Sequence, residues 1–175
     1  MMNEPAMQIK ASTAADAAAI QAVARAAWDA TYRDLIPAEA RAEYLRRAYD
    51  PGWLAQLHAR DNVRGFIVWR GAQAVGFAML SLGSPEEDPP GAVLRSLYLL
   101  PEAQKLGYGR KLLEAAREAA RASGAPFLWV AVHSGLSAAR RWYEQQGFIY
   151  DGPADTQIGG ANVNQAVYRM PLGRD

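Results

Sequence analysis

The sequence predicts an α/β protein built on a mixed sheet, and three observations support this fold class. Apolar residues recur at helical spacing from residue 13 to residue 48. Two strand patterns, at 66–69 and 74–80, then meet at a glycine turn. From residue 93 to residue 150, strand and helix patterns alternate. Such an alternation is typical of a sheet that is covered by helices.

The N-terminal part is expected to contain a short strand and two helices. Residues 7–10 have a strand pattern, and Thr13 with Asp16 has the spacing of a capping box at a helix start. The apolar face of this first helix consists of Ile20, Val23, Ala24, Ala27 and Trp28. Pro37 suits the first turn of a second helix, whose apolar residues include Tyr44, Leu45 and Ala48.

The rest of the chain is expected to alternate between strands and helices. The strands 66–69 and 74–80 form an antiparallel hairpin about Arg70 and Gly71, and a loop rich in proline and acid follows at 83–91. A helix pattern that begins at Ser137 ends at Gly147, a residue typical of helix C-termini. The remaining patterns are strands at 93–100, 127–132, 148–150 and 165–171 and a helix at about 108–123.

The most informative segment is the glycine-rich turn at 104–109, because it joins the strand 93–100 to the helix that follows. Glycine lets a backbone approach a ligand closely, and the free N–H groups and positive dipole end of a helix attract anions. The turn lacks the third glycine of a dinucleotide-binding loop, and no Gly-Lys-Ser or Gly-Lys-Thr of a P-loop occurs in the chain. What remains is a turn of the form Q-x-x-G-x-G, and a pyrophosphate is an anion that would suit it.

This turn resembles the acetyl-CoA pyrophosphate loop of the GNAT superfamily of N-acetyltransferases. The resemblance implies that acetyl-CoA is bound by Gln104, Lys105, Leu106, Gly107, Tyr108, Gly109 and Arg110. A second segment, Ala139-x-x-x-Tyr143-Glu144-x-x-Gly147-Phe148, is similar to the family segment whose tyrosine faces the CoA sulfur. Residues 26–32 are similar to the first helix of many members that act on small substrates. The resemblance implies one GNAT-like domain over residues 1–175, with a mostly antiparallel sheet flanked by helices on both faces.

Composition excludes several classes of function. The 175 residues include no cysteine, so thiol catalysis, disulfides and cysteine metal sites are absent, and a reducing cytoplasm is the expected location. The net charge of +1 is spread along the chain, which gives no support to a nucleic-acid partner. No apolar run approaches the length of a membrane span, and the first residues do not form a secretion signal. We expect no metal cofactor, and the sequence leaves a homodimer open.

Acetyl transfer to an amine needs donors for the thioester carbonyl, a proton for the departing thiolate and removal of a proton from the amine. In the family, the backbone N–H groups before the pyrophosphate loop bind pantetheine and the carbonyl, and the matching residues are Leu97, Tyr98 and Leu99. Tyr143 matches the tyrosine that protonates the thiolate. Because a phenol is a weaker acid than a thiol, a neutral tyrosine is suited to that role.

The base that accepts the amine proton is not evident from the sequence. Family members often place a glutamate on one of two motif strands, but this chain has Val93 and Leu94 on the first and apolar residues on the second. The open alternatives are a water chain and the side chains of Glu86, Glu87, Asp88, His133 and Tyr32. Leu136 stands where many members have an asparagine that contacts pantetheine.

The sequence therefore predicts an acetyl-CoA-dependent N-acetyltransferase that transfers the acetyl group directly to the amine of a small molecule. Trp28, Tyr32 and Trp129 are candidates for the wall of its acceptor pocket. Two alternatives stay open. The missing glutamate leaves room for a catalytically silent acyl-CoA-binding protein, and an open acceptor cleft would favour acetylation of a protein terminus or lysine.

Overall fold

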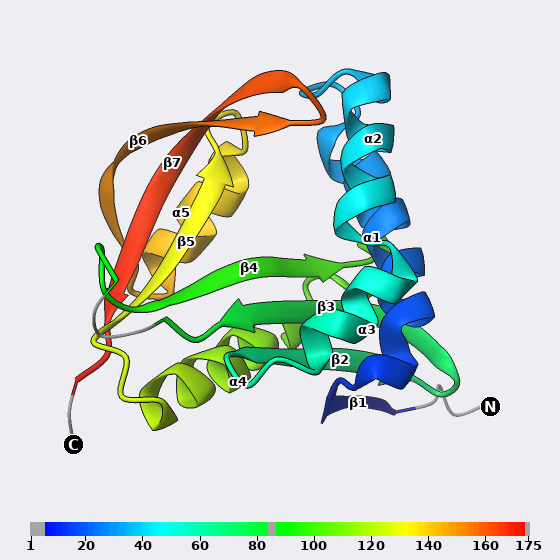
Figure 1. Ribbon diagram of the computed structural model, residues 1–175, viewed down its shortest axis with the longest axis horizontal. Helices are drawn as coiled ribbons and strands as arrows, with labels where there is room; N and C mark the ends of the chain where they lie inside the picture. Colours follow the sequence, from blue (N-terminus) through cyan, green and yellow to red (C-terminus); the bar gives the residue numbers. More distant parts are fainter. Residues whose placement is uncertain (1–5, 84–86, 174–175) are drawn as a thin grey trace.

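The computed structural model describes residues 6–83 and 87–173. In this part of the chain a single seven-stranded sheet has the order β1-β2-β3-β4-β5-β7-β6, and every neighbouring pair is antiparallel except β4 with β5 (Figure 1). The strands are β1 (Met7–Ala11), β2 (Val63–Arg70), β3 (Gln73–Ser81), β4 (Ala92–Leu99), β5 (Phe127–His133), β6 (Ile149–Ile158) and β7 (Ala161–Pro171). The helices are α1 (Ala17–Tyr32), α2 (Ala38–Ala48), α3 (Pro51–His58), α4 (Tyr108–Ala122) and α5 (Ser137–Gln145). The predicted mixed α/β fold is confirmed.

Helix α3 was not predicted, since Pro51 and Gly52 interrupt the helical pattern. The structure explains why a helix forms there. Proline is tolerated in a first turn, and the Asp50 carboxylate caps the helix by accepting a bond of 2.9 Å from the N–H of Trp53. Leu54 is buried, and His58 at the other end lies 2.8 Å from Ser12 Oγ. The helix is therefore held by one cap and two tertiary contacts rather than by propensity.

The C-terminal hairpin is longer than the sequence predicts. Strand β6 runs to Ile158 instead of ending at Tyr150, and β7 begins at Ala161 instead of Gln165. The missed residues include Gly152, Pro153, Asp155 and Asn162, which are poor strand formers, and most of β6 is exposed on an edge of the sheet. Pairing with β7 from Ile149 to Ile158 overrides these local preferences.

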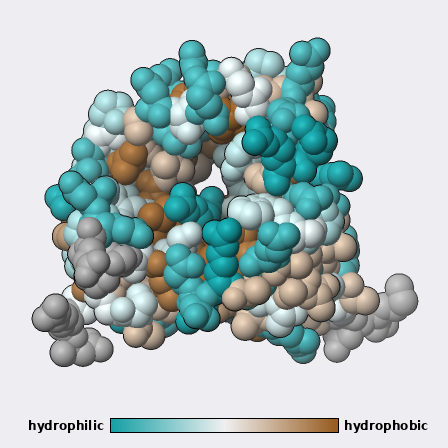
Figure 2. All heavy atoms as spheres, in the orientation of Figure 1, coloured by the Kyte–Doolittle hydropathy of each residue, from teal (hydrophilic) through white to brown (hydrophobic). Residues whose placement is uncertain are grey.

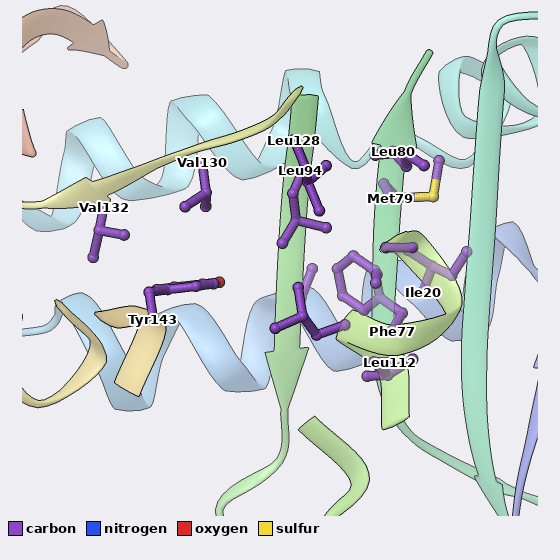
Figure 3. Close-up of a cluster of buried hydrophobic side chains, with 14 of the residues drawn as sticks. Ile20, Phe77, Met79, Leu80, Leu94, Leu112, Leu128, Val130, Val132 and Tyr143 are labelled. Atoms are coloured by element: carbon purple, nitrogen blue, oxygen red, sulfur yellow. The ribbon is translucent and has the colours of Figure 1, made fainter. Parts of the chain in front are cut away.

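Helices cover both faces of the sheet, and β4 shows how one strand serves both. Tyr98 faces α1, where its ring lies 6.3 Å from that of Trp28. Its neighbour Leu99 faces the other side, since its side chain would contact a Cβ placed on Gly109 in α4. Figure 3 shows buried residues of β3, β4 and β5 between Ile20 of α1 and, on the second side, Leu112 of α4 and Tyr143 of α5. The alternation of a strand thus assigns one face to each helical layer.

Two irregularities of β4 create the central feature of the fold. Met79 pairs with Ser96 but Leu80 pairs with Leu94, so Arg95 is an extra residue in a β-bulge. On its other edge, β4 pairs with β5 only at Ala92 and Val93. Beyond these residues the two strands diverge, as Figure 1 shows. A wedge-shaped gap in the sheet is the result.

The β6–β7 hairpin bridges the wide end of this wedge. It is attached to β5 through β7, and its turn at Gly159 and Gly160 lies against α2, which also contacts β6 (Figure 1). A Cβ built on Gly159 would clash with the carbonyl oxygen of Ala40, so the hairpin approaches α2 at backbone distance. The strands β4 and β5, the hairpin and α2 with α1 therefore form a closed ring of elements, and Figure 2 shows the molecule hollowed at its centre.

Replacing Gly159 by alanine should loosen the contact between the hairpin and α2. Gly159 has φ +54° and Gly160 has φ +82°, so alanine at either position bears the cost of left-handed backbone, roughly 1–2 kcal/mol. Only Gly159→Ala also meets the Ala40 carbonyl, since a Cβ on Gly160 would have nothing within 4 Å. Urea unfolding should show a clearly larger loss of stability for Gly159→Ala. Equal losses in the two variants would contradict the close approach.

Candidate active site

The turn before α4 has the conformation that its sequence predicts. Gly107 caps the helix at φ +85°, and Lys105 also has left-handed backbone at φ 59°. The first N–H groups of α4, at residues 108–110, have no acceptor within the helix. Lys105, Arg110 and Lys111 bring positive charge to the same turn, which contains no acidic residue. These features are the ones that favour binding of an anion at a helix N-terminus.

The two glycines of the turn have different surroundings. A Cβ on Gly107 would have nothing within 4 Å, so open space lies beside the backbone there. A Cβ on Gly109 would point into the protein, 3.5 Å from Leu99 Cδ1 and 3.6 Å from Trp142 Cζ2. A pyrophosphate fits the open side of Gly107, beside the free N–H groups and the basic residues. The turn therefore meets the requirements for the diphosphate of CoA.

The end of β4 leaves two of the three predicted backbone donors, those of Leu97 and Leu99, facing the wedge, whereas the N–H of Tyr98 is directed to β3. The N–H of Leu100 donates to Val75 O at 2.8 Å, and the register pairs Tyr98 with Phe77. Because N–H groups alternate along a strand, that of Tyr98 also faces β3, and those of Leu97 and Leu99 face the wedge. The Gln104 side chain donates to Leu99 O at 3.3 Å and links the turn to this strand end.

Tyr143 lies in the wedge. Figure 3 shows its side chain under Val130 and Val132 of β5, with the hydroxyl pointing toward β4. Burial, and to a lesser extent the neighbouring Tyr32, raises the pKa of Tyr143 above its usual value. The phenol is therefore neutral at physiological pH and holds a proton. The hydroxyl makes no hydrogen bond to any described residue, so it is available to a ligand in the wedge.

The motif residues that follow Tyr143 have a structural role: they form the C-terminal cap of α5. The N–H of Phe148 donates to Tyr143 O at 3.1 Å and that of Gly147 donates to Glu144 O at 3.1 Å, which together make a Schellman motif. Gly147 has φ +99°, which favours glycine. The Phe148 ring packs edge-on against Tyr143 at 5.3 Å. The cap thus fixes the ring whose hydroxyl faces the wedge.

A polar network joins α5 to β7 beneath this cap. The fully buried Tyr168 donates to Glu144 Oε1 at 3.0 Å, and its oxygen accepts from Arg140 Nε at 3.0 Å. Arg140 also donates to Ser134 O at 3.3 Å. Glu144 therefore acts by anchoring the helix that carries Tyr143, and its contacts are with protein groups.

On the opposite face of the sheet, a cleft of about 570 Å³ lies beside the wedge. Its walls come from β3, β4, β5, the β6–β7 hairpin, α2 and α3. Tyr49 lies at its base, where its hydroxyl is 3.0 Å from Ser96 Oγ. The polar and charged residues of its described lining include Arg60, Asn62, Ser81, Glu87, Arg95, Ser96, Thr156, Gln157 and Gln165. The cleft and the glycine-rich turn thus lie on different sides of the wedge.

The three aromatic residues predicted for the acceptor pocket lie around this cleft rather than in its described lining. Trp28 is buried and stacks at 4.6 Å on Tyr44, which does line the cleft. Tyr32 lies deeper, with its hydroxyl 3.1 Å from that of Tyr98. Trp129 donates from Nε1 to Pro90 O at 3.0 Å. Trp28 and Trp129 therefore support the wall, and Tyr32 lies between the cleft and the wedge.

The candidate bases are not equivalent. His133 Nδ1 accepts the N–H of Gly135 at 2.9 Å, so neutral His133 carries its proton on Nε2 and has no free basic nitrogen. Partial burial lowers the pKa of His133, which keeps the ring neutral at pH 7. Glu87 lines the cleft and is exposed, whereas Asp88 is exposed outside its described lining. Glu86 lies outside the described residues.

Sequence reasoning missed the parts of the cleft that depend on distant strands. Tyr49 and Gln165 have no motif around them, and Arg95 faces the cleft because of a bulge that no sequence pattern predicts. Among the described residues, no group of three or more metal-ligating side chains gathers, and no helix has the length and apolar character to span a membrane.

Comparison with known proteins agrees with this geometry. The model of the acetyltransferase (GNAT) family matches residues 22–148. Among curated proteins, none has a sequence that matches this chain. A PaiA N-acetyltransferase from Thermoplasma acidophilum, solved in complex with coenzyme A, is 22% identical, with a TM-score of 0.79 over 95% of this chain and 99% of that one.

Two further solved structures are similar over nearly their whole length. YncA from Salmonella typhimurium, a putative acetyltransferase solved with acetyl-CoA, is 21% identical, with a TM-score of 0.73 over 97% of this chain and 96% of its own. A ribosomal-protein-alanine N-acetyltransferase from Brucella melitensis is 25% identical, with a TM-score of 0.71 over 94% of this chain and 99% of its own. With the family model matching most of its length, the chain belongs to the GNAT family of acetyltransferases, enzymes that take their acetyl group from acetyl-CoA.

Proposed function

We propose that this protein is an N-acetyltransferase that acetylates the amine of a small molecule by direct transfer. The observation that carries the proposal is the meeting of three features at one gap: the wedge between β4 and β5, the free hydroxyl of Tyr143 and the cleft on the opposite face. An anion-binding turn at the far end of β4 completes the arrangement.

Acetyl-CoA supplies the acetyl group as a thioester, and the overall exchange forms a carbon–nitrogen bond, breaks the carbon–sulfur bond and moves one proton from the amine side to the sulfur side. The backbone at 107–110 would hold the diphosphate, and the N–H groups of Leu97 and Leu99 would bind the pantetheine arm and orient the carbonyl. Tyr143 Oη holds the proton needed by the sulfur. Its raised pKa keeps it protonated until that proton is required.

A small acceptor is favoured over a folded protein because the cleft lies within a closed ring of elements. The β6–β7 hairpin and α2 are in backbone contact at Gly159, so the described elements enclose this side of the cleft and hinder the docking of a polypeptide surface there. A flexible chain terminus that inserts end-first is the second candidate. It is favoured by the likeness to a ribosomal-protein-alanine N-acetyltransferase. A cytoplasmic location and a homodimer stay predictions.

The acceptor class is tested by measuring CoA release with amines, amino acids, polyamines, aminoglycosides and short peptides. The proposal expects a small amine to give the highest kcat/KM. Peptides better by tenfold or more would favour the second candidate. Rates no faster than uncatalysed transfer for every acceptor would support the silent-binder alternative and overturn the proposal.

Replacing Gly107 by alanine should weaken CoA binding, because the new methyl group enters the open space beside the turn. Gly124 at the other end of α4 is a matched control: it has φ +79°, and a Cβ there also has nothing within 4 Å. Both variants bear a similar cost of left-handed backbone, roughly 1–2 kcal/mol. Calorimetry should show at least a tenfold loss of CoA affinity for Gly107→Ala and little change for Gly124→Ala. Equal affinities would mean that the turn has only a structural role.

Tyr143→Phe should separate chemistry from binding. Phenylalanine preserves the packing against Phe148 and removes only the hydroxyl, so stability and CoA affinity should stay close to those of the wild type. The expected loss in kcat lies between a few-fold and the roughly 10²- to 10⁴-fold range of general acid catalysis. Tyr168→Phe is the contrasting variant, because it removes a hydroxyl that bonds only to protein groups and should lower the melting temperature more than kcat. An unchanged kcat for Tyr143→Phe would exclude Tyr143 as the proton donor.

The pH dependence should identify the route of the amine proton. An alkylamine near pKa 10 reacts only when deprotonated, and the sole unprotonated nitrogen of His133 is engaged with Gly135. We therefore expect kcat/KM to rise with pH toward the pKa of the amine, with water as the acceptor. Glu86→Gln, Glu87→Gln and His133→Ala should each retain most activity. A tenfold loss in one variant, with CoA binding and folding intact, would instead identify that residue as the base.

A further inference from the structure

The β-bulge of β4 places an arginine at the wall of the acceptor cleft. Leu94 and Ser96 pair with consecutive residues of β3, so Arg95 has no partner in the register. In such a bulge two successive side chains turn to nearly the same side of the sheet. Arg95 and Ser96 accordingly both line the cleft, although they are adjacent in a strand. The bulge therefore directs a guanidinium into a site that a regular strand would not offer it.

The guanidinium is fixed on one edge and open on the rest. Arg95 Nε donates to Ser81 Oγ at 3.1 Å, and none of the ion pairs between described residues involves Arg95. Burial raises the pKa of Tyr44, and the charge of Arg95 opposes this rise, which indicates that the two groups are close. The terminal nitrogens of Arg95 are thus oriented but retain free donors.

Among the described residues that line the cleft, positive charges outnumber negative ones. The charged residues of its described lining are Arg60, Glu87 and Arg95, and Arg60 packs 5.0 Å above the Trp53 ring. An acceptor whose only charged group is an ammonium would be repelled by these positive charges. An acceptor that also carries a carboxylate would neutralise the excess, since the fork of a guanidinium matches two carboxylate oxygens.

The position of Arg95 along β4 relates the anion to the reaction. Leu97, whose N–H faces the wedge, is two residues further on, a step of roughly 7 Å along a strand. If Arg95 bound the carboxylate of an acceptor, an amine a few bonds from that carboxylate in the same molecule would lie at the wedge. Arg60 lies outside β4, so the strand does not fix its distance from Leu97. We propose that the acceptor is a small amine that bears a carboxylate near its nitrogen, as in an amino acid, and that Arg95 binds this carboxylate. This inference rests on the function proposed above.

Matched acceptors test the proposal. Glycine, leucine, phenylalanine and glutamate are each compared with the corresponding α-amide, which keeps the amine and removes the negative charge. Because an amide lowers the pKa of the amine, the assay is run at pH 7, where the larger free-amine fraction of the amide outweighs its weaker nucleophilicity; a preference for the acid then cannot arise from amine reactivity. For at least one pair, wild-type enzyme should show at least a tenfold higher kcat/KM with the acid. Amides that match or exceed all four acids would overturn the proposal.

Variants of Arg95 assign the preference to the guanidinium. Arg95→Gln should raise KM for the preferred acid at least tenfold and leave its amide unchanged, and Arg95→Lys should recover part of the loss. Arg64→Gln is the control, because Arg64 is an exposed strand arginine whose described bonds go to Asp61 O and Val63 O. Equal losses for acid and amide in Arg95→Gln would mean that Arg95 only maintains the bulge.

A binding measurement separates this proposal from the proposed function. Calorimetry of CoA-loaded enzyme with the N-acetyl derivatives of the four amino acids detects carboxylate binding without turnover. Wild-type enzyme should bind at least one derivative at least tenfold more tightly than Arg95→Gln does. If the derivatives bind in this way but no amine is acetylated, the proposed function fails and the carboxylate site stands. If amines are acetylated but no derivative distinguishes the variants, the carboxylate site fails alone.

Discussion

The divergence of β4 from β5 is the constraint on which the rest of this structure depends. Two adjacent parallel strands would normally continue to pair, and each unpaired backbone group would lose a hydrogen bond when buried. Here pairing stops after Val93, and the edge beyond it faces a gap instead of a strand. A ligand that supplies acceptors and donors along this edge takes the place of the missing strand. The gap is therefore the part of the sheet at which a bound ligand would complete the hydrogen bonding.

The groups around the gap are held by connections that reach across the sequence. Tyr143 is positioned by a helix cap, by the Phe148 ring and by the bond of Glu144 to Tyr168 on β7. On the other face, Tyr49 bonds to Ser96 at the bulge. Each link is modest by itself, about 1 kcal/mol for an ordinary hydrogen bond. Together they keep a protonated phenol and a polar cleft on opposite sides of one opening.

The parts of the site that the sequence predicts are those with local causes. The glycine turn, its left-handed Gly107 and the cap at Gly147 depend on backbone preferences that are visible in a few letters. The cleft behaves differently, because Arg95, Tyr49 and Gln165 are brought together by a bulge, the C-terminal end of α2 and a long hairpin. Trp28 illustrates the same limit: helical spacing identifies it as apolar, but only the packing of Tyr44 over it decides which ring faces the cleft.

The contact between Gly159 and α2 also determines the order in which the two halves of the site can form. The end of β4 and the glycine-rich turn, which hold CoA in the proposed arrangement, are complete once residue 122 has been synthesised. Strand β4 pairs there with β3, which directly precedes it in the sheet and in the sequence. The ring around the cleft closes only when the β6–β7 turn reaches Ala40, more than a hundred residues earlier in the chain. Contacts of such long range form slowly, because the entropy of a large loop must be lost first. During synthesis and folding, we therefore expect the ring around the cleft to close after the glycine-rich turn has formed.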